Sequence, residues 1–517
     1  DGDGFESIIK AKLADYSNPD LRTKVVKSIR SYHLSFESVT TAVNDNLTKL
    51  SQDNSVAVVT GQQVGMLGGP LYTLYKSFHT VILAKKYSVL YPQYSFVPIF
   101  WQETEDHDFQ EVRAVNVVGN DFQLKNIAYT PSSPIEKVQV GGLKFETEAL
   151  ATFFAELKAA LPKTDFSDSI FELYERCYNS EVTFAQAQAA LLMALFAEEG
   201  LLIINANTRE LKSFAAPLFT KEITNTPALS EAIVKQSEFL SVNYHAQIDA
   251  KGINLFLATA GKRMKLQQDG DSIKAGDSSF SKEELLAIIQ NEPERLSMNV
   301  VMRPLVQDTI LPTVSYVAGP GEIAYFAQLQ AAYNWAGLQM PRIVPRITFT
   351  LIEERFEKLV DTSGTSIDAL LEHSNDLVRE LLTTEQEQKL ALTFETTTEA
   401  IENSIEGLRN LVETTDPSLA TSLTTLKGKI ASQVRDFSAK TLGAERKKQQ
   451  TTKQQFDKAL TVLLPQGKLQ ERELNLVYFL NKYGMSFLSN LKNYLLTETF
   501  DPKEHLLLSI KSILPPK

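Results

Sequence analysis

The sequence of 517 residues contains a single cysteine, Cys177. One cysteine excludes an intrachain disulfide and a zinc site built on cysteine ligands, and it is typical of a protein from a reducing cytosol. Cys177 lies in the helix-like stretch FELYERCYNSEV, which carries no neighbouring histidine. We therefore interpret it as a half-buried thiol and not as a nucleophile.

Long apolar runs and an excess of basic residues are also absent. No stretch reaches the roughly 18 uninterrupted apolar residues that a membrane-spanning helix requires, and DGDGFESIIKAKL at the N-terminus lacks the apolar run of a secretory signal. The net charge of −11 disfavours nonspecific binding of nucleic acid. These absences predict a cytoplasmic protein without a membrane or nucleic-acid partner, and they leave the binding of small anions in a locally basic pocket open.

Strand-like and helix-like runs alternate over the first two thirds of the chain. The strand-like runs are 55–61, 94–101, 112–118, 201–206 and 341–353, and the helix-like runs include 70–88 and 185–200. This alternation predicts an α/β fold with a parallel sheet in a core of residues 1–355. Segments near 140–180 and 225–290 read as insertions, and the second contains short strands and the helix SKEELLAIIQ, whose Ser281 and Glu284 fit a capping box.

The composition changes after about residue 355, where glycine becomes sparse and apolar residues recur at three- and four-residue steps. These runs are Ile367, Leu371, Val378 and Leu381; Phe394, Ile401, Ile405, Leu408 and Val412; and Leu419, Leu423, Leu426, Ile430, Val434 and Phe437. Pro417 interrupts them, so 356–460 is predicted to form an antiparallel coiled-coil hairpin. We interpret it as an arm for packing or dimerisation. Its basic run at 445–455 favours a solvated face, although the run could also reach a phosphate over a pocket. The apolar segment 461–517 is predicted to dock back on the core.

A glycine-rich loop, within VVTGQQVGMLGGPLYTLYK at 58–76, is the first candidate site. Glycines let the backbone approach a ligand closely, and a helix N-terminus behind them is a ready anion site. The loop matches neither a Walker A sequence nor GxGxxG. A tight turn that only packs well is the alternative, but the two adjacent glutamine amides favour a ligand loop. The candidate binding residues are Thr60, Gly61, Gln62, Gln63, Gly65, Gly68, Gly69, Tyr72 and Lys76.

The second candidate site is the acidic segment WQETEDHDFQEV at 101–112, which directly follows a strand. Open α/β sheets carry their sites at the carboxyl ends of strands. Crowded carboxylates raise each other's pKa and keep a histidine charged, a setting for acid–base chemistry or for holding an ammonium group. The residues are Trp101 for binding and Glu105, Asp106, His107 and Asp108 for catalysis, with Glu103 beside them. A solvated acidic helix cap is the alternative. With one histidine and no HxxxH spacing, no metal site is predicted.

The third candidate site lies in RPLVQDTILPTVSYVAGPGEIAYFAQL, residues 303–329. Arg303 and Asp308 are expected to flank a strand-like run, and a Gly-Pro-Gly turn then leads into a helix. Tyr325 and Gln328 follow Glu322 at three-residue steps and share its face. The candidate binding residues are Arg303, Gly319, Gly321, Glu322, Tyr325 and Gln328. Three strand-end sites in one α/β core predict one shared cleft.

Together with PQGKLQERELN at 465–475, these three motifs closely resemble the bacillithiol biosynthesis cysteine-adding enzyme family, also called cysteine ligases. The resemblance implies a Rossmann-like core, similar to nucleotidyltransferases and class I aminoacyl-tRNA synthetases, and a coiled coil that supports a homodimer. It also implies the last step of bacillithiol synthesis, in which the cysteine carboxyl is joined to the free amine of glucosaminyl-malate, with ATP as the expected source of activation. The sequence departs from the synthetase pattern: TGQQ stands in place of HxGH, and GKRMKL at 261–266 matches KMSKS poorly.

The motifs fit that chemistry in the following way. The loop from Gly61 to Gly69 and Arg303 would hold the malate carboxylates or a phosphate, the acidic segment would hold an ammonium group, and His107 would take a proton from the attacking amine. Two other readings remain open. One is a protein that binds a nucleotide or another small ligand and recruits a partner through the hairpin, and the other is a hydrolase or transferase acting on a different amino sugar.

Overall fold

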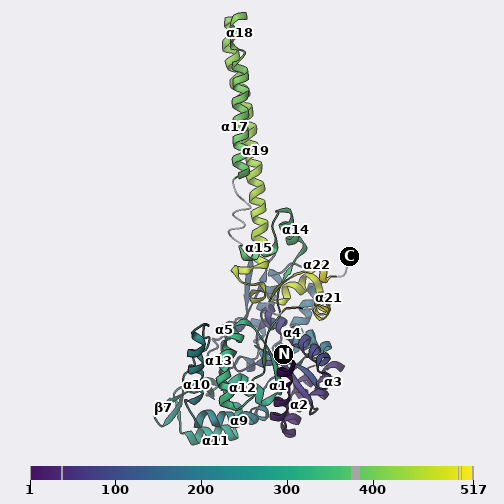
Figure 1. The fold of residues 1–517 in the computed structure, drawn as a ribbon, viewed down its shortest axis with the longest axis vertical. Coiled ribbons are helices and arrows are strands. Elements are labelled where there is room, and N and C mark those ends of the chain that lie inside the picture. The colour runs from purple at the N-terminus through teal and green to yellow at the C-terminus, as the bar shows by residue number, and fades with distance from the viewer. Residues whose placement is uncertain (1, 37–38, 374–384, 499, 502–503, 515–517) are drawn as a thin grey trace. The chain divides into compact units, whose positions relative to one another are not determined.

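The computed structural model describes residues 2–36, 39–373, 385–498, 500–501 and 504–514 (Figure 1). The chain divides into two compact units. We call the first the α/β unit: it comprises residues 1–350, 469–508 and 512–517. The second, which we call the arm unit, comprises residues 351–468 and 509–511.

The α/β unit is built on a five-stranded parallel sheet. The strand order is β12-β11-β1-β2-β5. The bounds are β1 (Ser55–Gln63), β2 (Ser95–Glu103), β5 (Leu202–Ile204), β11 (Thr313–Ala318) and β12 (Arg342–Pro345). β1 and β2 pair along their whole length, from Ser55 opposite Ser95 to Gln63 opposite Glu103. The predicted α/β fold with a parallel sheet is confirmed.

Helices cover both faces of this sheet. Ala57 and Val59 of β1 point into a core formed with α2, α3, α9, α12 and α13, whereas Val56 and Val58 point into a second core with α1 and α4. The bounds are α1 (Gly2–Asp15), α2 (Pro19–Leu34), α3 (Thr41–Leu50), α4 (Leu71–Leu90), α9 (Arg209–Thr224), α12 (Met302–Ile310) and α13 (Pro320–Ala336). A sheet with both faces covered leaves its strand ends as the place for a ligand site.

Two expectations about individual elements were wrong. The run after Arg303 is not strand-like but forms α12, in which Arg303 Nη1 donates to Gln307 Oε1 at 3.0 Å. This pair sits four residues apart, a helical spacing that the apolar character of the run concealed. The strand at 112–118 forms β3 (Ala114–Val118), which pairs antiparallel with β4 (Leu124–Ala128) and not with the central sheet. The turn between them makes a local hairpin.

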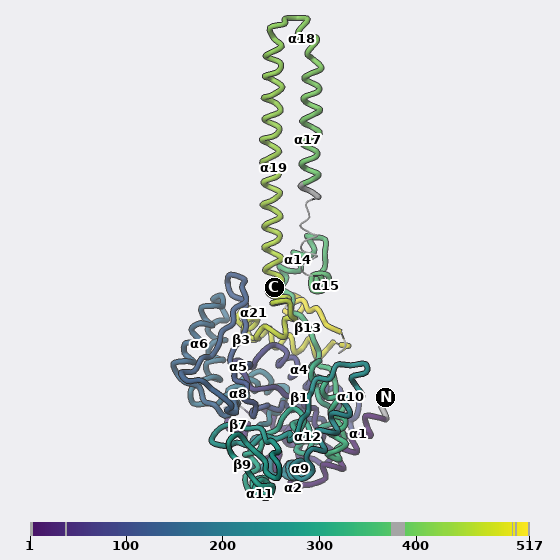
Figure 2. Tube along the Cα trace, turned by 90° about the vertical axis from the view of Figure 1, so that its left-hand side faces the viewer, coloured from purple at the N-terminus to yellow at the C-terminus, as the bar shows by residue number. Residues whose placement is uncertain are grey.

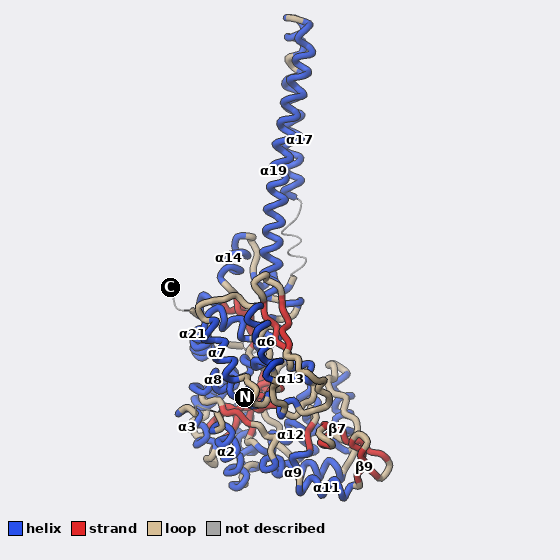
Figure 3. The backbone as a smooth tube through the Cα atoms, turned by 180° about the vertical axis from the view of Figure 1, so that it is seen from behind, coloured by secondary structure: helices blue, strands red, loops and turns tan. Residues whose placement is uncertain are grey.

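Both expected insertions have their own secondary structure. The first contains α6 (Thr147–Ala160) and α7 (Ser167–Cys177), followed by α8 (Phe184–Phe196). The second contains α10 (Ala228–Ser241), an antiparallel sheet in the order β10-β6-β7-β8-β9, and α11 (Lys282–Asn291), capped by Ser281 and Glu284 as predicted (Figure 3). Its strands are β6 (Leu255–Thr259), β7 (Lys262–Asp269), β8 (Ser272–Ala275), β9 (Ser278–Phe280) and β10 (Leu296–Met298).

Part of the C-terminal segment belongs to the α/β unit, which includes residues 469–508. This part contains α20 (Gln470–Glu473) and α21 (Leu476–Thr497). Asn475, between these helices, donates through Nδ2 to the carbonyl oxygens of Leu67 and Gly69, at 3.0 and 2.6 Å. Near the end of the chain lie β14 (His505–Ser509) and α22 (Ile510–Ile513), and β14 pairs with β13 (Thr348–Ile352), which precedes the helical hairpin.

The arm unit contains a long helical hairpin. Its helices are α14 (Glu354–Thr362), α15 (Ile367–Glu372), α17 (Glu385–Glu406), α18 (Arg409–Thr415) and α19 (Ala420–Leu463). α17 and α19 run side by side (Figures 1 and 2), with the rings of Phe394 and Phe437 6.1 Å apart. The predicted interruption at Pro417 is confirmed by a short 3₁₀ turn, whereas Val378 and Leu381 lie outside the described residues. Among the described helices, none is both long and apolar enough to cross a bilayer.

Candidate active site

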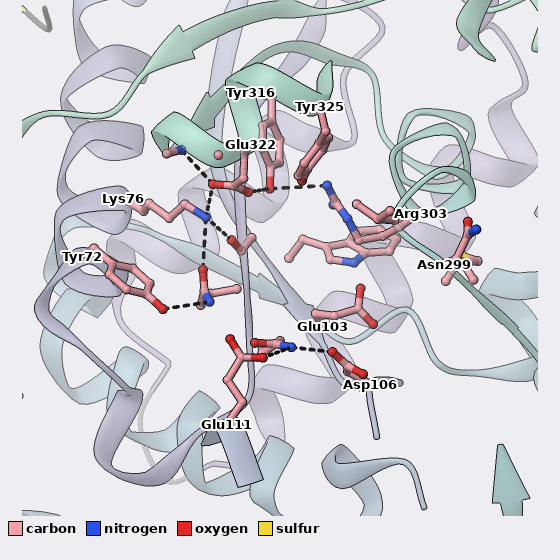
Figure 4. A pocket seen from close by; sticks show the side chains of 18 of the residues that line it. Tyr72, Lys76, Glu103, Asp106, Glu111, Asn299, Arg303, Tyr316, Glu322 and Tyr325 are labelled. Atoms are coloured by element: carbon pink, nitrogen blue, oxygen red, sulfur yellow. Dashed lines mark hydrogen bonds and ion pairs between the residues drawn. The ribbon is translucent and has the colours of Figure 1, made fainter. Parts of the chain in front are cut away.

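A cavity of about 580 Å³ opens at the carboxyl edge of the central sheet (Figure 4). It lies where β1, β2 and β11 end, so the three candidate motifs do meet at one edge. The sequence-predicted residues that line it are Gly61, Gln62, Gln63, Tyr72, Lys76, Trp101, Asp106, Arg303, Gly319, Gly321, Glu322 and Tyr325. Its volume suits a small-molecule ligand.

An ion pair between Lys76 and Glu322 forms one wall of the cavity. Lys76 Nζ lies 2.5 Å from Glu322 Oε2 and also donates to the carbonyl oxygen of Gly61 at 2.7 Å. Burial lowers the pKa of Lys76, and the charge of Glu322 opposes this. Burial alone would raise the pKa of Glu322, but Lys76 and the N–H of Gly319 hold it below its usual value. The carboxylate is therefore ionised at neutral pH, and this wall holds a fixed pair of opposite charges.

Glu322 is held by a local motif as well as by Lys76. It is the third residue of α13 and accepts from the N–H of Gly319 at 2.7 Å, which closes a capping box at the start of the helix. Its other oxygen accepts from the Tyr316 hydroxyl at 2.9 Å. The Gly319–Glu322 turn thus fixes a carboxylate at the cavity wall.

Arg303 carries a permanent positive charge into the cavity. Its side chain is buried and lies over the ring of Tyr316, 5.3 Å from the ring centroid. Burial alone would lower the pKa of Arg303, but the neighbouring oxygens of Tyr316, Tyr325 and Glu103 raise it above its ordinary value. The guanidinium therefore suits a carboxylate or phosphate oxygen of a ligand.

The opposite part of the cavity is acidic. Gln63 Nε2 donates to Asp106 and, at 3.2 Å, to Glu111, so this side chain joins two carboxylates (Figure 4). The backbone N–H of His107 donates to Asp106 Oδ1 at 2.6 Å. These carboxylates are suited to an ammonium group of a ligand.

Glu103 is the third carboxylate on this side, and it lies at the last position of β2. Burial and the charge of Glu105 raise the pKa of Glu103 to about 7, against the opposing effects of Arg303 and Arg263. A carboxyl group in this state can exchange a proton near neutral pH.

His107 lies beside the cavity but is not among the residues that line it. Its Nδ1 is 2.8 Å from Arg263 Nη1. An arginine can only donate, so Nδ1 accepts, and we assign the neutral tautomer with the proton on Nε2. Asp106 Oδ1 is farther away, 3.6 Å from the same nitrogen. The expected charged histidine, held by its acidic neighbours, is therefore not what this geometry favours.

The glycine-rich loop packs inside the protein. The Tyr178 hydroxyl donates to the carbonyl oxygen of Gly65 and accepts from the N–H of Gly68, both at 2.9 Å, and Asn475 binds Gly69. The first N–H of α4, at Leu71, donates to the carbonyl oxygen of Leu474 at 2.9 Å. Gly65, Gly68 and Gly69 are not among the cavity-lining residues, so the geometry of these three glycines agrees with a turn that packs well. Gly61, Gln62 and Gln63, at the start of the same motif, do line the cavity.

Four further candidates also lie elsewhere. Thr60 is buried and donates to the carbonyl oxygen of Val317, and Asp108 caps the short helix α5 (Phe109–Val112). Glu105 is buried in an ion pair with Lys212, and its Oε2 has no hydrogen-bond partner among the described residues. Gln328 is buried and accepts from the N–H groups of residues 247 and 248. All four use their polar atoms to hold the chain together.

Cys177 is buried on α7, and burial raises the pKa of its thiol to about 11, so the thiol stays protonated at neutral pH. In the part of the chain that the structure describes, no group of three or more His, Cys, Asp or Glu side chains is arranged to hold a metal ion.

Five charged cavity residues were not among the predicted site residues. These are Glu103, Glu111, Arg263, Arg346 and Arg472. Glu103 and Glu111 lie in the acidic segment, Arg263 in GKRMKL, and Arg472 in the motif at 465–475. Arg346 lies within the strand-like run 341–353, directly after Pro345. A local signal existed for each of them, but no spacing along the chain relates the three arginines to the acidic segment.

Arg263 shows how the second insertion reaches the cavity. It lies on β7, where Nε donates to Ser297 Oγ at 3.0 Å and Nη2 to the carbonyl oxygen of Met298 at 2.6 Å. Its guanidinium also lies 3.8 Å from the ring centroid of Phe256. These contacts fix the guanidinium beside His107 and Asp106.

Comparison with known proteins gives concordant results along the chain. The family description "Bacillithiol biosynthesis BshC, N-terminal Rossmann-like domain" matches residues 2–347, and "Bacillithiol biosynthesis BshC, C-terminal coiled-coil domain" matches residues 349–509.

Individual relatives are similar over most of their length. A protein of Chlorobaculum tepidum named "Putative cysteine ligase BshC" is 35% identical over 480 residues, which cover 90% of this chain and 84% of the relative. Proteins of the same name from Salinibacter ruber and Bacillus velezensis are 34% and 30% identical, over 88% and 94% of this chain and 83% and 91% of the relatives.

Proposed function

The chain belongs to the bacillithiol biosynthesis BshC family, and we propose that it is a cysteine ligase. The reaction would join the carboxyl group of cysteine to the amine of glucosaminyl-malate through an amide bond, as the last step of bacillithiol synthesis. The names of the relatives support the ligase activity. The substrates are our proposal from the chemistry of the cavity and from the family.

One observation carries the proposal: the cavity presents both signs of charge at the carboxyl edge of the sheet. Arg263, Arg303, Arg346 and Arg472 line it together with Glu103, Asp106 and Glu111. Glucosaminyl-malate carries two carboxylates and one amine, and cysteine carries one of each. Guanidinium groups suit the carboxylates, and the acidic residues suit the amines in their ammonium form.

Amide formation needs an activated carboxyl group, and we propose ATP as its source. The guanidinium groups that suit a carboxylate suit phosphate oxygens equally well, so the charge of the cavity fits a triphosphate. The exposed Arg472 is the residue that we expect to hold it. The described residues contain no Walker A loop. At the end of β1, where such a loop would begin, the sequence is Thr-Gly-Gln-Gln.

The hairpin of the arm unit would support a homodimer. Leu392, Leu411 and Phe437 of this hairpin are between 61% and 68% exposed, an apolar content that a second copy of the chain would cover. Analytical ultracentrifugation of the full chain tests this directly. A monomer at micromolar concentration would remove the dimer from the proposal without touching the reaction.

The reaction is tested in a bacillithiol-producing bacterium whose own gene for this step is deleted. Expression of the full chain should restore bacillithiol, measured by mass spectrometry of the labelled thiols. It should also remove the accumulated glucosaminyl-malate, measured by mass spectrometry of the unlabelled extract. A strain with the empty vector gives the baseline. An unchanged thiol pool with well-expressed, folded protein would contradict the proposal. Binding of ATP by that protein would then favour a ligand-binding interaction protein.

A further inference from the structure

Glu103 differs from the other carboxylates of the cavity in how its oxygens are used. Oε1 accepts from the backbone N–H of Glu105 at 3.3 Å. For the second oxygen, no donor is recorded among the described residues. Both oxygens of Asp106 and both of Glu322 are engaged, and Glu111 is exposed. Glu103 is therefore the half-buried carboxylate with a free oxygen at the cavity.

Charged groups surround Glu103 without pairing with it. Arg303 of α12 and Arg263 of β7 act on its pKa from the basic side, and Glu105 and Asp106 act on it from the segment that follows β2. In the described part of the chain, neither arginine forms an ion pair with Glu103 within 4.0 Å. Desolvation and the nearby carboxylates outweigh the arginines, so this carboxyl group can hold or release a proton near pH 7.

His107 is placed differently. Its Nδ1 accepts from Arg263, which is itself bound to Ser297 and Met298. His107 is not among the cavity-lining residues, and the contact with Arg263 occupies the ring nitrogen that could accept a proton. His107 is therefore better suited to holding Arg263 in place.

We infer that Glu103 is the proton acceptor for the attacking amine, and that Arg303 holds the oxygen of the carbonyl under attack. The inference rests on the proposed ligase function. In the step, the neutral amine of glucosaminyl-malate attacks the carbonyl carbon of cysteine, whose carboxyl group carries a phosphoryl-type leaving group. The C–N bond forms, the C–O bond to the leaving group breaks, and the leaving group departs with the electron pair. The proton from nitrogen goes to the carboxylate of Glu103.

Arg303 carries the positive charge, and lies at the position, that holding the carbonyl oxygen requires. Glu103 is close enough to Arg303 to raise its pKa, so the guanidinium stays charged throughout. Figure 4 shows both side chains at the cavity. A fixed cation beside the proton acceptor stabilises the negative charge that develops on the carbonyl oxygen. His107 acts as a positioning residue through Arg263.

The test uses the deletion strain described above with four variants of the full chain. Glu103→Gln should reduce bacillithiol formation at least 100-fold, because loss of a general base costs roughly 10²–10⁴ in rate. Glu103→Asp keeps a carboxylate and should retain more activity than Glu103→Gln. His107→Gln should reduce activity about tenfold. Glu156→Gln, at an exposed position on α6, is the matched control and should act as wild type.

A second readout does not depend on turnover. Infrared difference spectra of purified protein between pH 6 and pH 8 should show a carboxylic acid band that is lost as the pH rises. This band should be absent from Glu103→Gln and present in His107→Gln and Glu156→Gln. The spectra also show that each variant is folded, through the amide bands.

The outcomes separate the two proposals. If the wild-type chain does not restore bacillithiol, the proposed function fails, whatever the spectra show. If wild type restores it and Glu103→Gln restores it to a similar level, the inference about Glu103 is wrong and the function stands. The inference would also be overturned if His107→Gln reduced bacillithiol formation more than Glu103→Gln does. The inference is supported if Glu103→Gln loses bacillithiol formation and its infrared spectra lack the carboxylic acid band.

Discussion

Two glycine-containing turns of the α/β unit have opposite roles. Each lies between a parallel strand and a helix, one at Gly65–Gly69 after β1 and the other at Gly319–Gly321 after β11. The first is filled by Tyr178 and Asn475 from other parts of the chain. The second opens on the cavity and fixes Glu322 there.

The comparison shows that a glycine in a turn indicates that another group comes close to the backbone there. It does not indicate whether that group belongs to the protein or to a ligand. In the first turn the approaching groups are side chains of the protein, so its polar atoms contribute to stability. In the second they are left for a ligand, and the charges around the cavity are kept at a cost in stability. The following changes test this contrast, from the largest expected effect to the smallest.

Loss of Lys76 should have the largest effect on stability. Lys76→Met leaves Glu322, whose side chain is 19% exposed, without its buried cation, which should lower the free energy of unfolding by about 3–5 kcal/mol. Chemical denaturation of the full chain measures it. The double variant Lys76→Met/Glu322→Gln should regain part of this loss, because no unpaired buried charge remains. If the double variant is no more stable than Lys76→Met, the ion pair is not what links the two residues.

Removal of the Tyr178 hydroxyl tests the packed turn. Tyr178→Phe deletes the bonds to Gly65 and Gly68 and leaves the Gly68 N–H and the Gly65 carbonyl oxygen with only their mutual contact at 3.3 Å. The free energy of unfolding should fall by about 1–3 kcal/mol, while bacillithiol formation per folded molecule stays at the wild-type level. Thermal unfolding and thiol profiling give the two values. Loss of activity without loss of stability would return this loop to the ligand site.

Two matched glycine substitutions compare the turns directly. At Gly68 the backbone has φ of +80° and an added Cβ would lie 3.2 Å from Leu191 Cδ2, so Gly68→Ala should cost about 1–2 kcal/mol. At Gly321 an added Cβ meets open space. Gly321→Ala should leave stability unchanged or raise it by up to about 1 kcal/mol, but the new methyl group lines the cavity and should weaken binding of the proposed substrate, glucosaminyl-malate. Calorimetric titration and thermal unfolding check both, and equal effects in the two variants would contradict the contrast.

The pH dependence of stability should show the smallest effect, at Glu103. The pKa of Glu103 is about 7 in the folded protein and 4.5 ordinarily, so the folded state holds this proton more tightly. The resulting stabilisation is full below about pH 4.5 and is lost as the pH rises through 7. Glu103→Gln stays neutral, so its advantage over wild type should grow by about 1 kcal/mol from pH 6 to pH 7. Denaturant titrations at both pH values measure this, with Glu156→Gln as the control; a pH-independent difference would contradict it.

Much of the fold followed from local patterns. Alternating strand-like and helix-like runs predicted the parallel sheet, and the periodicity around Pro417 predicted the hairpin. The errors arose where a local pattern was ambiguous: an apolar run concealed α12, and the turn after β3 formed a separate hairpin. The site was predicted at the right edge because parallel strands end together, as Gln63 and Glu103 do.

The sequence by itself determined which elements form and that three polar strand ends share an edge, since both depend on spacing along the chain. Only the tertiary structure decided which polar groups face the cavity. Tyr178 fills the first glycine turn from 110 positions away, Lys212 covers Glu105 from 107, and Arg263 meets His107 from 156. Such partners are chosen by packing between distant segments, for which no local pattern exists, and their choice leaves Glu103 with an oxygen open to a ligand.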